Sequence, residues 1–391
     1  MNSADWLLHC SEILSQRHER ALLRGRVTLK QIDAAHVEVD GKRYVNFASN
    51  DYLGLTHHPQ VLAAASNASA AGSGAAGLIT GQTEAHARCE QAIARWKATE
   101  AAVLLPSGYQ ANLAAVQTLA AIGATYPLGA RFLIDKLAHA SLIDAVRSTD
   151  EAMRVFPHNG IPKLRRLLEQ AEPNQIQIVL TESIFSMDGD AAELAAIAEL
   201  KARYPFVLLL DEAHGSGVYG PDGAGYAAES GLSNVVDVSI VTLSKAIGCS
   251  GGAVCSSKVF RDALLNFGRA YIYSTSVSPF ICESVQAAIK VMQHEPWRRQ
   301  RVRELSASVR TRLRGSGMKI PDGDSPIIPI VLGEETAALK VAEKLKDDGL
   351  LVIAVRPPTV PPLSSRLRIT LSCAHSDEEI ERLIQAVGKI N

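Results

Sequence analysis

The chain has 391 residues, and its 40 Lys and Arg residues are balanced by 41 Asp and Glu residues, for a formal net charge of −1. This balance disfavours a protein that binds nucleic acid or acidic membranes, because such proteins carry a basic excess. With 47% apolar and 21% charged residues, the composition also excludes a disordered chain. The length exceeds what one hydrophobic core supports, so at least two domains are expected.

The N-terminal segment mixes charged and apolar residues and lacks the uninterrupted apolar core of a secretory signal. Trp6, Leu7, Ile13 and Leu14 recur with helical spacing, which predicts an amphipathic helix. No apolar run reaches the roughly 18 residues of a membrane span. The cysteines are scattered without C-x-x-C spacing, so we expect thiols in a reducing cytoplasm and no metal site.

Short apolar runs alternate with helical patterns through the first two thirds of the chain. The predicted strands are 102–105, 131–134, 178–181, 207–210, 238–242 and 253–255, and the predicted helices are 84–97, 161–171 and 191–203. Thr83 is a candidate N-cap for the first of these helices. The run 206–210 has no polar alternation, as in a strand that is covered on both faces. The pattern therefore predicts an α/β fold with a mostly parallel sheet between helices.

After about residue 278 the pattern changes to that of a smaller α+β domain. Its predicted elements are a long, charged helical stretch over roughly 279–314, strands at 327–332, 350–355 and 367–371, and helices over 336–348 and 376–390. We therefore expect an N-terminal helix with short strands over 1–45, a large domain over 46–280 and a small C-terminal domain over 281–391.

Polar residues follow four of the predicted strands, at the point where each strand ends. These segments are 135–139, 182–190, 211–214 and 242–245. Ligands bind at the carboxyl ends of parallel strands, so the four segments predict one shared site.

Two glycine motifs match known signatures without the required context. The segment 72–77 fits G-x-G-x-x-G, but a helix-like stretch precedes it where a dinucleotide site needs a strand, so we expect a loop. The segment 248–252 fits G-x-S-x-G, but 245–247 separates it from the strand, which favours a glycine turn over a hydrolase elbow. The adjacent His57 and His58 resemble a metal pair, yet adjacent side chains on an extended chain point apart, so we expect loop residues.

Asp211 and Lys245 each follow a buried strand, and together they indicate a specific chemistry. A lysine amine in a site of low polarity can form a Schiff base with an aldehyde. A carboxylate in the same site can keep a pyridine nitrogen protonated, so that the ring accepts electrons. Pyridoxal 5′-phosphate (PLP) needs both groups and also a phosphate cup, for which residues 106–109 at the start of a predicted helix are the candidate.

Motifs along nearly the whole chain, from about Arg24 onward, resemble the α-oxoamine synthase family of fold-type I PLP enzymes, which share the aspartate aminotransferase-like fold. The matching segments are N-F-A-S-N-D-Y-L-G-L at 46–55, H-A-S at 139–141, F-S-M-D-G-D at 185–190, D-E-A-H-G at 211–215, T-L-S-K at 242–245, Y-S-T at 273–275, R-P-P-T-V-P-P at 356–362 and R-L-R-I-T-L at 366–371 with A-H at 374–375. The resemblance implies a PLP-dependent C-acyltransferase with a large PLP-binding domain, a smaller C-terminal domain and a homodimer with shared active sites.

The resemblance also implies residue roles around the cofactor. Lys245 would hold the cofactor and later move a proton, Asp211 would pair with the ring nitrogen, and His139 would stack on the ring. His214 and Ser186 would hydrogen-bond the ring's phenolic oxygen. The phosphate would be held by Gly108, Tyr109, Thr242 and, from a second subunit, Thr275.

The segments 356–362 and 366–371 most resemble the branch of the family that condenses L-alanine with a pimeloyl thioester, carried by coenzyme A or an acyl carrier protein, in biotin biosynthesis. By this resemblance Arg368 would bind the amino-acid carboxylate and Asn50 would lie beside the reacting centre. Thr359 would lie near the thioester, and Arg24 is a candidate contact for the end of the acyl chain or the carrier. The loop 74–78 departs from the family pattern near the acyl site, which leaves the chain-length preference open.

Other functions stay open on the sequence. The sister activity of 2-amino-3-ketobutyrate CoA ligase, which joins glycine and acetyl-CoA, is the nearest alternative. An aminotransferase of the same fold and a non-enzymatic relative with a repurposed pocket are more distant. Glu182 and Asp188 suggest paired acid and base carboxylates, but a strand-end network and a turn explain them better, and His375 suits a structural role.

Overall fold

The computed structural model describes residues 5–390, which divide by their contacts into two units. The larger unit comprises Asn50–Ser186 and Asp190–Arg303, and the smaller unit comprises the N-terminal residues up to Ser49, the short segment Met187–Gly189 and the residues from Glu304 onward. The expected division into 1–45, 46–280 and 281–391 stays a prediction.

The larger unit is built on a seven-stranded sheet with the strand order β4-β10-β9-β8-β7-β5-β6. Its strands are β4 (Ala101–Leu105), β5 (Ala130–Asp135), β6 (Ala152–Phe156), β7 (Ile176–Glu182), β8 (Val207–Asp211), β9 (Val238–Thr242) and β10 (Gly252–Ser256). Neighbours from β9 to β6 are parallel, whereas β10 is antiparallel to both β9 and β4. The predicted mostly parallel sheet is therefore confirmed, and β6 is an additional edge strand that the apolar pattern did not reveal.

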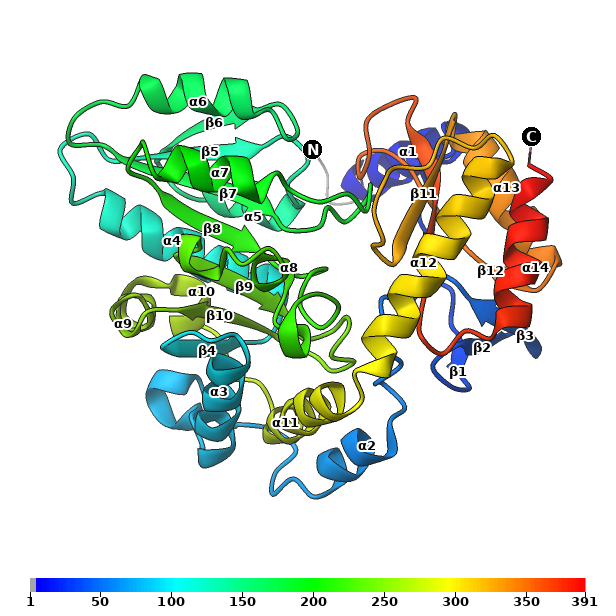
Figure 1. Cartoon of the computed structure of the whole chain (residues 1–391), viewed down its shortest axis with the longest axis horizontal. Helices are drawn as coiled ribbons and strands as arrows, with labels where there is room; N and C mark the ends of the chain where they lie inside the picture. The colour runs from blue at the N-terminus through cyan, green and yellow to red at the C-terminus, as the bar shows by residue number, and fades with distance from the viewer. Residues whose placement is uncertain (1–4, 391) are drawn as a thin grey trace. The chain divides into compact units, whose positions relative to one another are not determined.

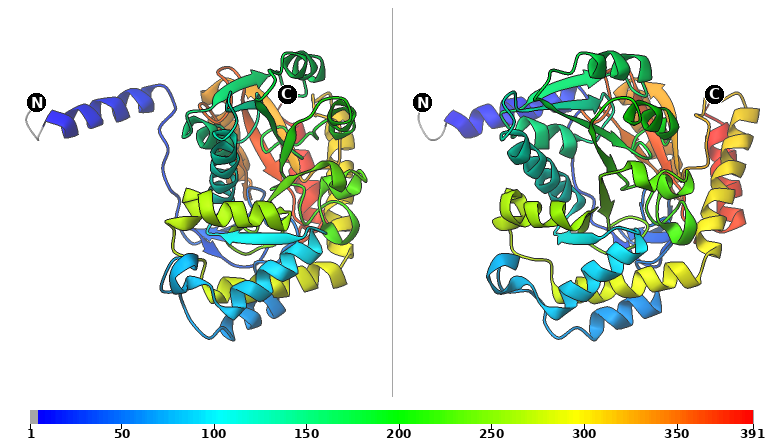
Figure 2. Two further views of the ribbon diagram at one scale, coloured as in Figure 1. Left: turned by 90° about the vertical axis from the view of Figure 1, so that its left-hand side faces the viewer. Right: turned by 60° about the vertical axis from the view of Figure 1, so that its left-hand side comes forward.

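Helices cover both faces of this sheet (Figure 1, Figure 2). One core cluster joins the sheet to α4 (Gly108–Gly123), α5 (Ala140–Arg147), α9 (Lys258–Phe267) and α10 (Arg269–Ile272). The other joins it to α6 (Ile161–Glu169), α7 (Leu194–Lys201) and α8 (Tyr226–Glu229). Successive residues of β5 alternate between the two clusters, Phe132 and Ile134 in the first and Leu133 in the second. Both faces are buried, which explains the continuous apolar runs.

The remaining helices of the larger unit include α2 (Pro59–Ser66), α3 (Glu84–Trp96) and α11 (Pro279–His294), and α12 spans Trp297–Gly315. Short helical turns occur at Gly77–Gly81, Pro221–Gly223 and Ser233–Val235. The predicted helical stretch over 279–314 is present but divided into α11 and α12, because the chain leaves the helical conformation at Glu295. Pro296 follows directly, and proline has no N–H to continue the helical hydrogen bonds.

The smaller unit holds two sheets. The first has the order β1 (Lys30–Gln31), β2 (His36–Val39), β3 (Lys42–Asn46) and β12 (Leu350–Leu351), and the second has the order β11 (Ile327–Gly333), β14 (Ser365–Thr370) and β13 (Ile353–Val355). Its further helices are α1 (Asp5–Glu19), α13 (Glu335–Asp347) and α14 (Asp377–Gly388). The predicted strand 350–355 is therefore wrong as a single element, because its two halves pair in different sheets.

The N-terminal helix α1 forms as predicted, but none of its residues is buried. Trp6 and Leu8 are 57% and 65% exposed. The apolar stripe that predicted an amphipathic helix therefore faces solvent in the single chain. No helix among residues 5–390 is long and apolar enough to cross a membrane.

Candidate active site

Four adjacent parallel strands end at one edge of the larger unit's sheet, and the predicted polar segments follow them. The strands are β9, β8, β7 and β5, which neighbour one another in that order. Glu182 and Asp211 are the last residues of β7 and β8 and lie opposite each other in the register. The convergence that the sequence predicted is therefore present, and all the cofactor-binding candidates belong to this unit.

Lys245 stands at the end of a hydrogen-bonded chain of side chains. Its Nζ lies 2.8 Å from His214 Nε2, and His214 Nδ1 lies 2.7 Å from the hydroxyl of Tyr52. Tyr52 in turn donates to Asn50 Oδ1 at 3.1 Å. With a protonated lysine every link has one donor, because the ammonium donates to Nε2 and Nδ1–H donates to the phenol oxygen. The chain gives a proton on Lys245 a defined path to the imidazole.

Asp211 is a buried carboxylate, 4% exposed, with both oxygens held. Its Oδ1 accepts from the backbone N–H of Ala213 at 2.9 Å, and its Oδ2 accepts from Asn112 Nδ2 at 2.7 Å. These two donors hold the carboxylate in one orientation. An anchored carboxylate of this kind suits a partner that carries a positive charge, such as a protonated ring nitrogen.

Glu182 is a second buried carboxyl group beside Asp211. Burial, and then the charge of Asp211, raise the pKa of Glu182 well above its usual range. The backbone N–H groups of Ser186 and His139 donate to the Glu182 carboxyl group. Glu182 thus belongs to the strand-end network that the sequence analysis favoured, and it holds the backbone of two residues expected at the cofactor ring.

His139 caps the N-terminus of α5, and its ring is accessible to solvent. Its Nδ1 lies 2.7 Å from Ser141 Oγ. Burial of part of the ring lowers the pKa of His139. The negative charge of Asp211 raises this pKa, and the positive charge of Lys245 lowers it further. A neutral ring with an accessible face can stack on a flat, positively charged heterocycle without charge repulsion.

The start of α4 has the features of a phosphate cup. Ser107 caps the helix by accepting from the N–H of Gln110 at 3.1 Å, and the first amides of a helix lack acceptors within the helix. A Cβ atom on Gly108 would lie 2.2 Å from Thr242 Oγ1, so only glycine lets this hydroxyl approach the amides. A helix N-terminus with an adjacent hydroxyl suits a phosphate, and the residues present therefore fit PLP.

The contacts of Tyr109 and Thr275 support a role in cofactor binding less directly than those of the other candidates. The Tyr109 hydroxyl donates to Asp144 Oδ2 at 2.7 Å, which raises the pKa of Tyr109. Its contribution to a phosphate would therefore come from the backbone N–H. Thr275 is exposed and bridges to Ala76, at the surface of the larger unit.

The three other substrate candidates, Arg24, Thr359 and Arg368, belong to the smaller unit. Arg24 Nη2 donates to Thr359 Oγ1 at 2.9 Å, although the two residues are 335 positions apart. The guanidinium of Arg356 also binds the segment that carries Arg24, because it donates to the carbonyls of Ala21 and Leu23. Arg368 lies on the central strand β14, opposite Pro329 and Ile353. The structure thus brings Arg24 and Thr359 together.

Residues that sequence reasoning set aside have structural partners. Asp188 pairs with Arg366 at 2.6 Å, and His58 caps α2 and lies 3.3 Å from Glu295. His375 Nδ1 accepts from the N–H of Ser372 at 3.0 Å. No group of three or more His, Cys, Asp or Glu side chains in the described range 5–390 could hold a metal ion.

His158 lies between two carboxylates at the same sheet edge. Its Nδ1 is 3.2 Å from Asp135 and its Nε2 is 2.7 Å from Asp190. Burial alone would lower the pKa of His158, but the two carboxylates outweigh it and raise the pKa to about 10. The imidazolium therefore ties the end of β5 to the segment that carries Ser186.

We expect His158→Gln to lose stability in a pH-dependent way. The folded pKa of about 10 exceeds the ordinary histidine value of about 6.5, so the stabilisation is complete below pH 6.5 and is lost as the pH rises to 10. Urea unfolding of both proteins at several pH values checks this. A stability difference that stays constant or widens toward pH 10 would contradict it.

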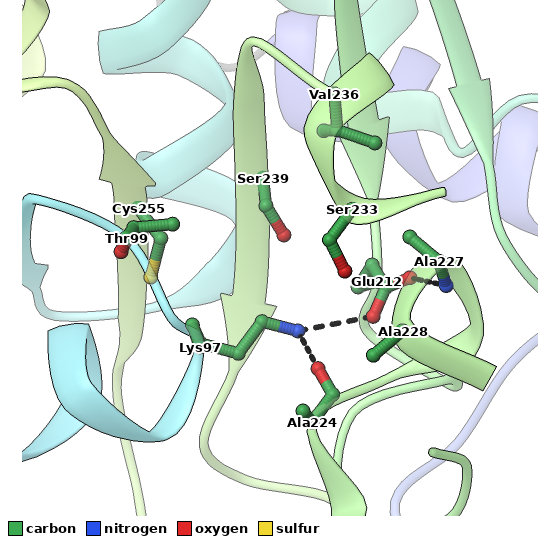
Figure 3. Close-up of a pocket in the computed structure, with 10 residues that line it drawn as sticks. All are labelled: Lys97, Thr99, Glu212, Ala224, Ala227, Ala228, Ser233, Val236, Ser239 and Cys255. Carbon is green, nitrogen blue, oxygen red and sulfur yellow. Dashed lines mark hydrogen bonds and ion pairs between the residues drawn. The ribbon is translucent and has the colours of Figure 1, made fainter. Parts of the chain in front are cut away.

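Beneath the motif 211–215 lies a buried ion pair (Figure 3). Lys97 Nζ is 3.0 Å from Glu212 Oε2 and 3.1 Å from Ser216 Oγ, and it also donates to the carbonyl of Ala224. The other oxygen of Glu212 accepts from the N–H of Ala227 at 2.8 Å. The pair borders a cavity of about 30 Å³ and secures the turn that follows Asp211.

We expect Lys97→Met to destabilise the protein by about 3–5 kcal/mol, because it leaves the buried carboxylate of Glu212 without its cation. Urea unfolding measures the loss. The matched control is Arg88→Ala on α3, which breaks an exposed ion pair with Glu283 and should cost less than about 1 kcal/mol. Equal losses in the two variants would show that burial of the pair does not matter.

Sequence reasoning missed several residues of this site. Tyr52 lies inside the segment 46–55, which carried the family resemblance, but nothing in the pattern indicated its contact with His214. Asn112 and Lys97 lie on or beside ordinary helical patterns, and their partners Asp211 and Glu212 are distant in the chain, so no local signal could identify them. Ser141 lies inside the segment 139–141, which carried the family resemblance, but nothing in the pattern indicated its contact with Asn112.

Comparisons with known proteins agree over nearly the full length. The family model for class I and II aminotransferases matches residues 42–387. The 8-amino-7-oxononanoate synthase of Cellvibrio japonicus is 39% identical over 381 residues, which cover 96% of this chain and 94% of that protein. The enzyme of the same name from Alkalilimnicola ehrlichii is 37% identical over 395 residues, covering 100% and 99%.

Solved structures show the same fold. Serine palmitoyltransferase from Sphingomonas wittichii aligns with a TM-score of 0.89 and 27% identity, covering 100% of this chain and 97% of that one. A structure of an SPT variant with PLP aligns with a TM-score of 0.91 and 25% identity, covering 98% of both chains. The 8-amino-7-oxononanoate synthase of Francisella tularensis aligns with a TM-score of 0.75 and 24% identity over 88% of this chain and 97% of that one.

Proposed function

The chain belongs to the class I and II aminotransferase family, and from this premise we propose that it is a PLP-dependent acyltransferase that makes 8-amino-7-oxononanoate from L-alanine and a pimeloyl thioester, a step of biotin biosynthesis. Its fold is that of the fold-type I PLP transferases. The observation that carries the proposal is the amine of Lys245 in contact with His214 at the sheet edge where Asp211 ends the neighbouring strand. The near full-length relatives of that name support the substrate pair.

In the proposed site, PLP when bound supplies an electron sink for the negative charge that develops at the amino-acid Cα. Lys245 Nζ would be its attachment point, and the Asp211 carboxylate would accept the N–H of its ring. His139 would stack on the ring, and Ser186 and His214 would hydrogen-bond its phenolic oxygen. The amides of Gly108 and Tyr109 and the hydroxyl of Thr242 hold its phosphate. The hydrogen bonds of Lys245, Asp211 and His139 and the approach of Thr242 to the start of α4 support these roles.

The proposed reaction forms one carbon–carbon bond and breaks the carbon–sulfur and Cα–carboxylate bonds, while the Cα–H bond is broken and later remade. The alanine Cα bonds to the thioester carbonyl carbon, the thiolate leaves that carbon and takes a proton from solvent, and the alanine carboxylate leaves as CO₂. Lys245 Nζ takes the Cα proton at the start, and a proton returns to Cα after CO₂ has left. His214 and Tyr52 hold a hydrogen-bonded path for that proton.

Four residues are proposed for the substrates. Arg368 binds the alanine carboxylate, and Asn50, which already accepts from Tyr52, lies beside the reacting centre. Thr359 lies near the thioester, and Arg24 binds the far end of the acyl chain or its carrier. The hydrogen bond between Arg24 and Thr359 supports their placement in one substrate-binding segment.

We also propose a homodimer in which Thr275 completes the phosphate site of the partner. Large apolar side chains exposed near it, Ile79 at 76% and Tyr273 at 74%, support a covered surface in the assembly. The acyl group can be carried by coenzyme A or by an acyl carrier protein. Activity assays with each of these two donors in turn distinguish them. Cytoplasmic location stays a prediction from the sequence.

Mass spectrometry of the products tests the function. The protein reconstituted with PLP is supplied with L-alanine and pimeloyl-CoA, and we expect a mass equal to alanine plus the acyl group less CO₂. Parallel reactions with glycine and acetyl-CoA test the sister activity. Product from that pair and none from alanine and pimeloyl-CoA would overturn the proposal. Sedimentation of the loaded protein tests the homodimer, and a monomer would contradict it.

A further inference from the structure

The amide of Asn112 links two residues of the proposed cofactor site. Asn112 lies in the second turn of α4 and is 2% exposed. Its Nδ2 donates to Asp211 Oδ2 at 2.7 Å and to Ser141 Oγ at 2.8 Å. A side-chain amide nitrogen carries two hydrogens, so both are used. The reversed amide would place an oxygen against the Asp211 carboxylate, and this repulsion fixes the orientation.

Ser141 passes the link on to His139. Because Ser141 Oγ accepts from Asn112, its own hydrogen is available for His139 Nδ1, which lies 2.7 Å away. The backbone N–H of Ser141 also points at Nδ1, at 3.2 Å. Two donors therefore meet at this nitrogen, which must be the unprotonated one. The proton of the neutral ring is then on Nε2.

This tautomer matters for a ring that stacks on a protonated pyridine. Asp211 stabilises the positive charge of the pyridine, and an imidazolium at His139 would repel that charge. A His139 ring that accepts two hydrogen bonds at Nδ1 resists a second proton. A proton on Nδ1 would face the two donor hydrogens that now point at this atom. The buried amide of Asn112 thus hydrogen-bonds the Asp211 carboxylate directly and acts on the His139 ring through Ser141.

We propose that Asn112 and Ser141 are positioning residues that act through Asp211 and His139: Asn112 orients the carboxylate, and the two together hold His139 neutral with its proton on Nε2. The inference rests on the proposed function, because that proposal assigns the nitrogen of the PLP ring to Asp211 and the face of the ring to His139. Neither residue needs to touch the cofactor or the substrates for this role.

The variants Asn112→Ala and Ser141→Ala test the proposal by equilibrium dialysis of the apoprotein against PLP. We expect Asn112→Ala to raise the dissociation constant of PLP by about 10- to 100-fold, the range for a lost hydrogen bond to a charged group. Ser141→Ala should raise it less, and Ser141→Thr, which keeps the hydroxyl, should restore it. The matched control is Thr118→Val, a buried residue of α4 whose hydroxyl donates to Ala114 O inside the helix.

A second readout uses the apoprotein without PLP. The ¹⁵N shifts of His139, assigned by comparison with His139→Gln, should show the Nε2–H tautomer in the parent and a mixture of tautomers in Ser141→Ala. Unchanged PLP affinity together with an unchanged tautomer in both alanine variants would overturn the proposal, as would an equal loss of affinity in Thr118→Val. Neither readout uses an acyl substrate, so a wrong assignment of the reaction would leave both results interpretable.

Discussion

Lys245→Ala is expected to lower kcat for product formation from L-alanine and pimeloyl-CoA by at least about 10⁴-fold. The change removes the amine that is proposed to attach the cofactor and to take the Cα proton, and the alanine side chain can do neither. The contact with His214, 2.8 Å from Nζ, is lost as well. The measurement is product formation by mass spectrometry, together with the absorption band of the cofactor bound to lysine, which should disappear.

The matched control for this variant is Lys136→Ala. Lys136 is also a lysine just beyond a strand at the same sheet edge, after β5, but it is exposed. Its removal should leave the absorption band and kcat within about twofold of the parent, since exposed side chains away from a site contribute little. A Lys245→Ala protein that kept either the band or more than about a tenth of the activity would refute the assigned role.

Asp211→Asn is expected to lower kcat/KM for L-alanine by about 10³-fold. The neutral amide can no longer stabilise a positive charge on the ring nitrogen. It also cannot satisfy both present donors, the N–H of Ala213 and Nδ2 of Asn112, because it offers one oxygen and one NH₂ group. Steady-state kinetics with varied L-alanine, at saturating pimeloyl-CoA and PLP, measures the loss.

Asp211→Glu separates the charge from the geometry at this position. It keeps the carboxylate but displaces it from the two donors, so its kcat/KM should lie between those of the parent and Asp211→Asn. The far-ultraviolet circular dichroism of both variants should match that of the parent. If Asp211→Asn retained more than about a tenth of the parental kcat/KM, the ring would not depend on this carboxylate.

Most residues of the proposed cofactor site could be picked out from sequence because they sit at recognisable local positions. Asp211 and Lys245 follow runs of buried residues, and such runs identify strands covered on both faces. The carboxyl ends of parallel strands meet at one edge, so two local observations predicted a shared site. Gly108 was identifiable in the same way, since a polar, glycine-containing segment opens a helix directly after a strand.

Predictions failed where a local pattern had more than one tertiary solution. The stretch 279–314 has helical character throughout, yet Pro296 separates α11 from α12. The segment 350–355 is apolar throughout, but Leu350 pairs with Val45 and Ile353 pairs with Arg368, in different sheets. Periodicity reports which residues prefer to be buried and does not report which partner buries them.

The sequence by itself determined three features: the balanced charge of the chain, its alternating strands and helices, and the residue types at the strand ends. They are local or summed properties, and they led to the α/β fold and to Lys245 and Asp211, whereas the role of His139 came from the family resemblance. Only the tertiary structure decided the links between them. Asn112 reaches Asp211 across 99 positions, and Tyr52 reaches His214 across 162. Such contacts depend on how helices pack on the sheet, and a single sequence carries no direct record of that packing.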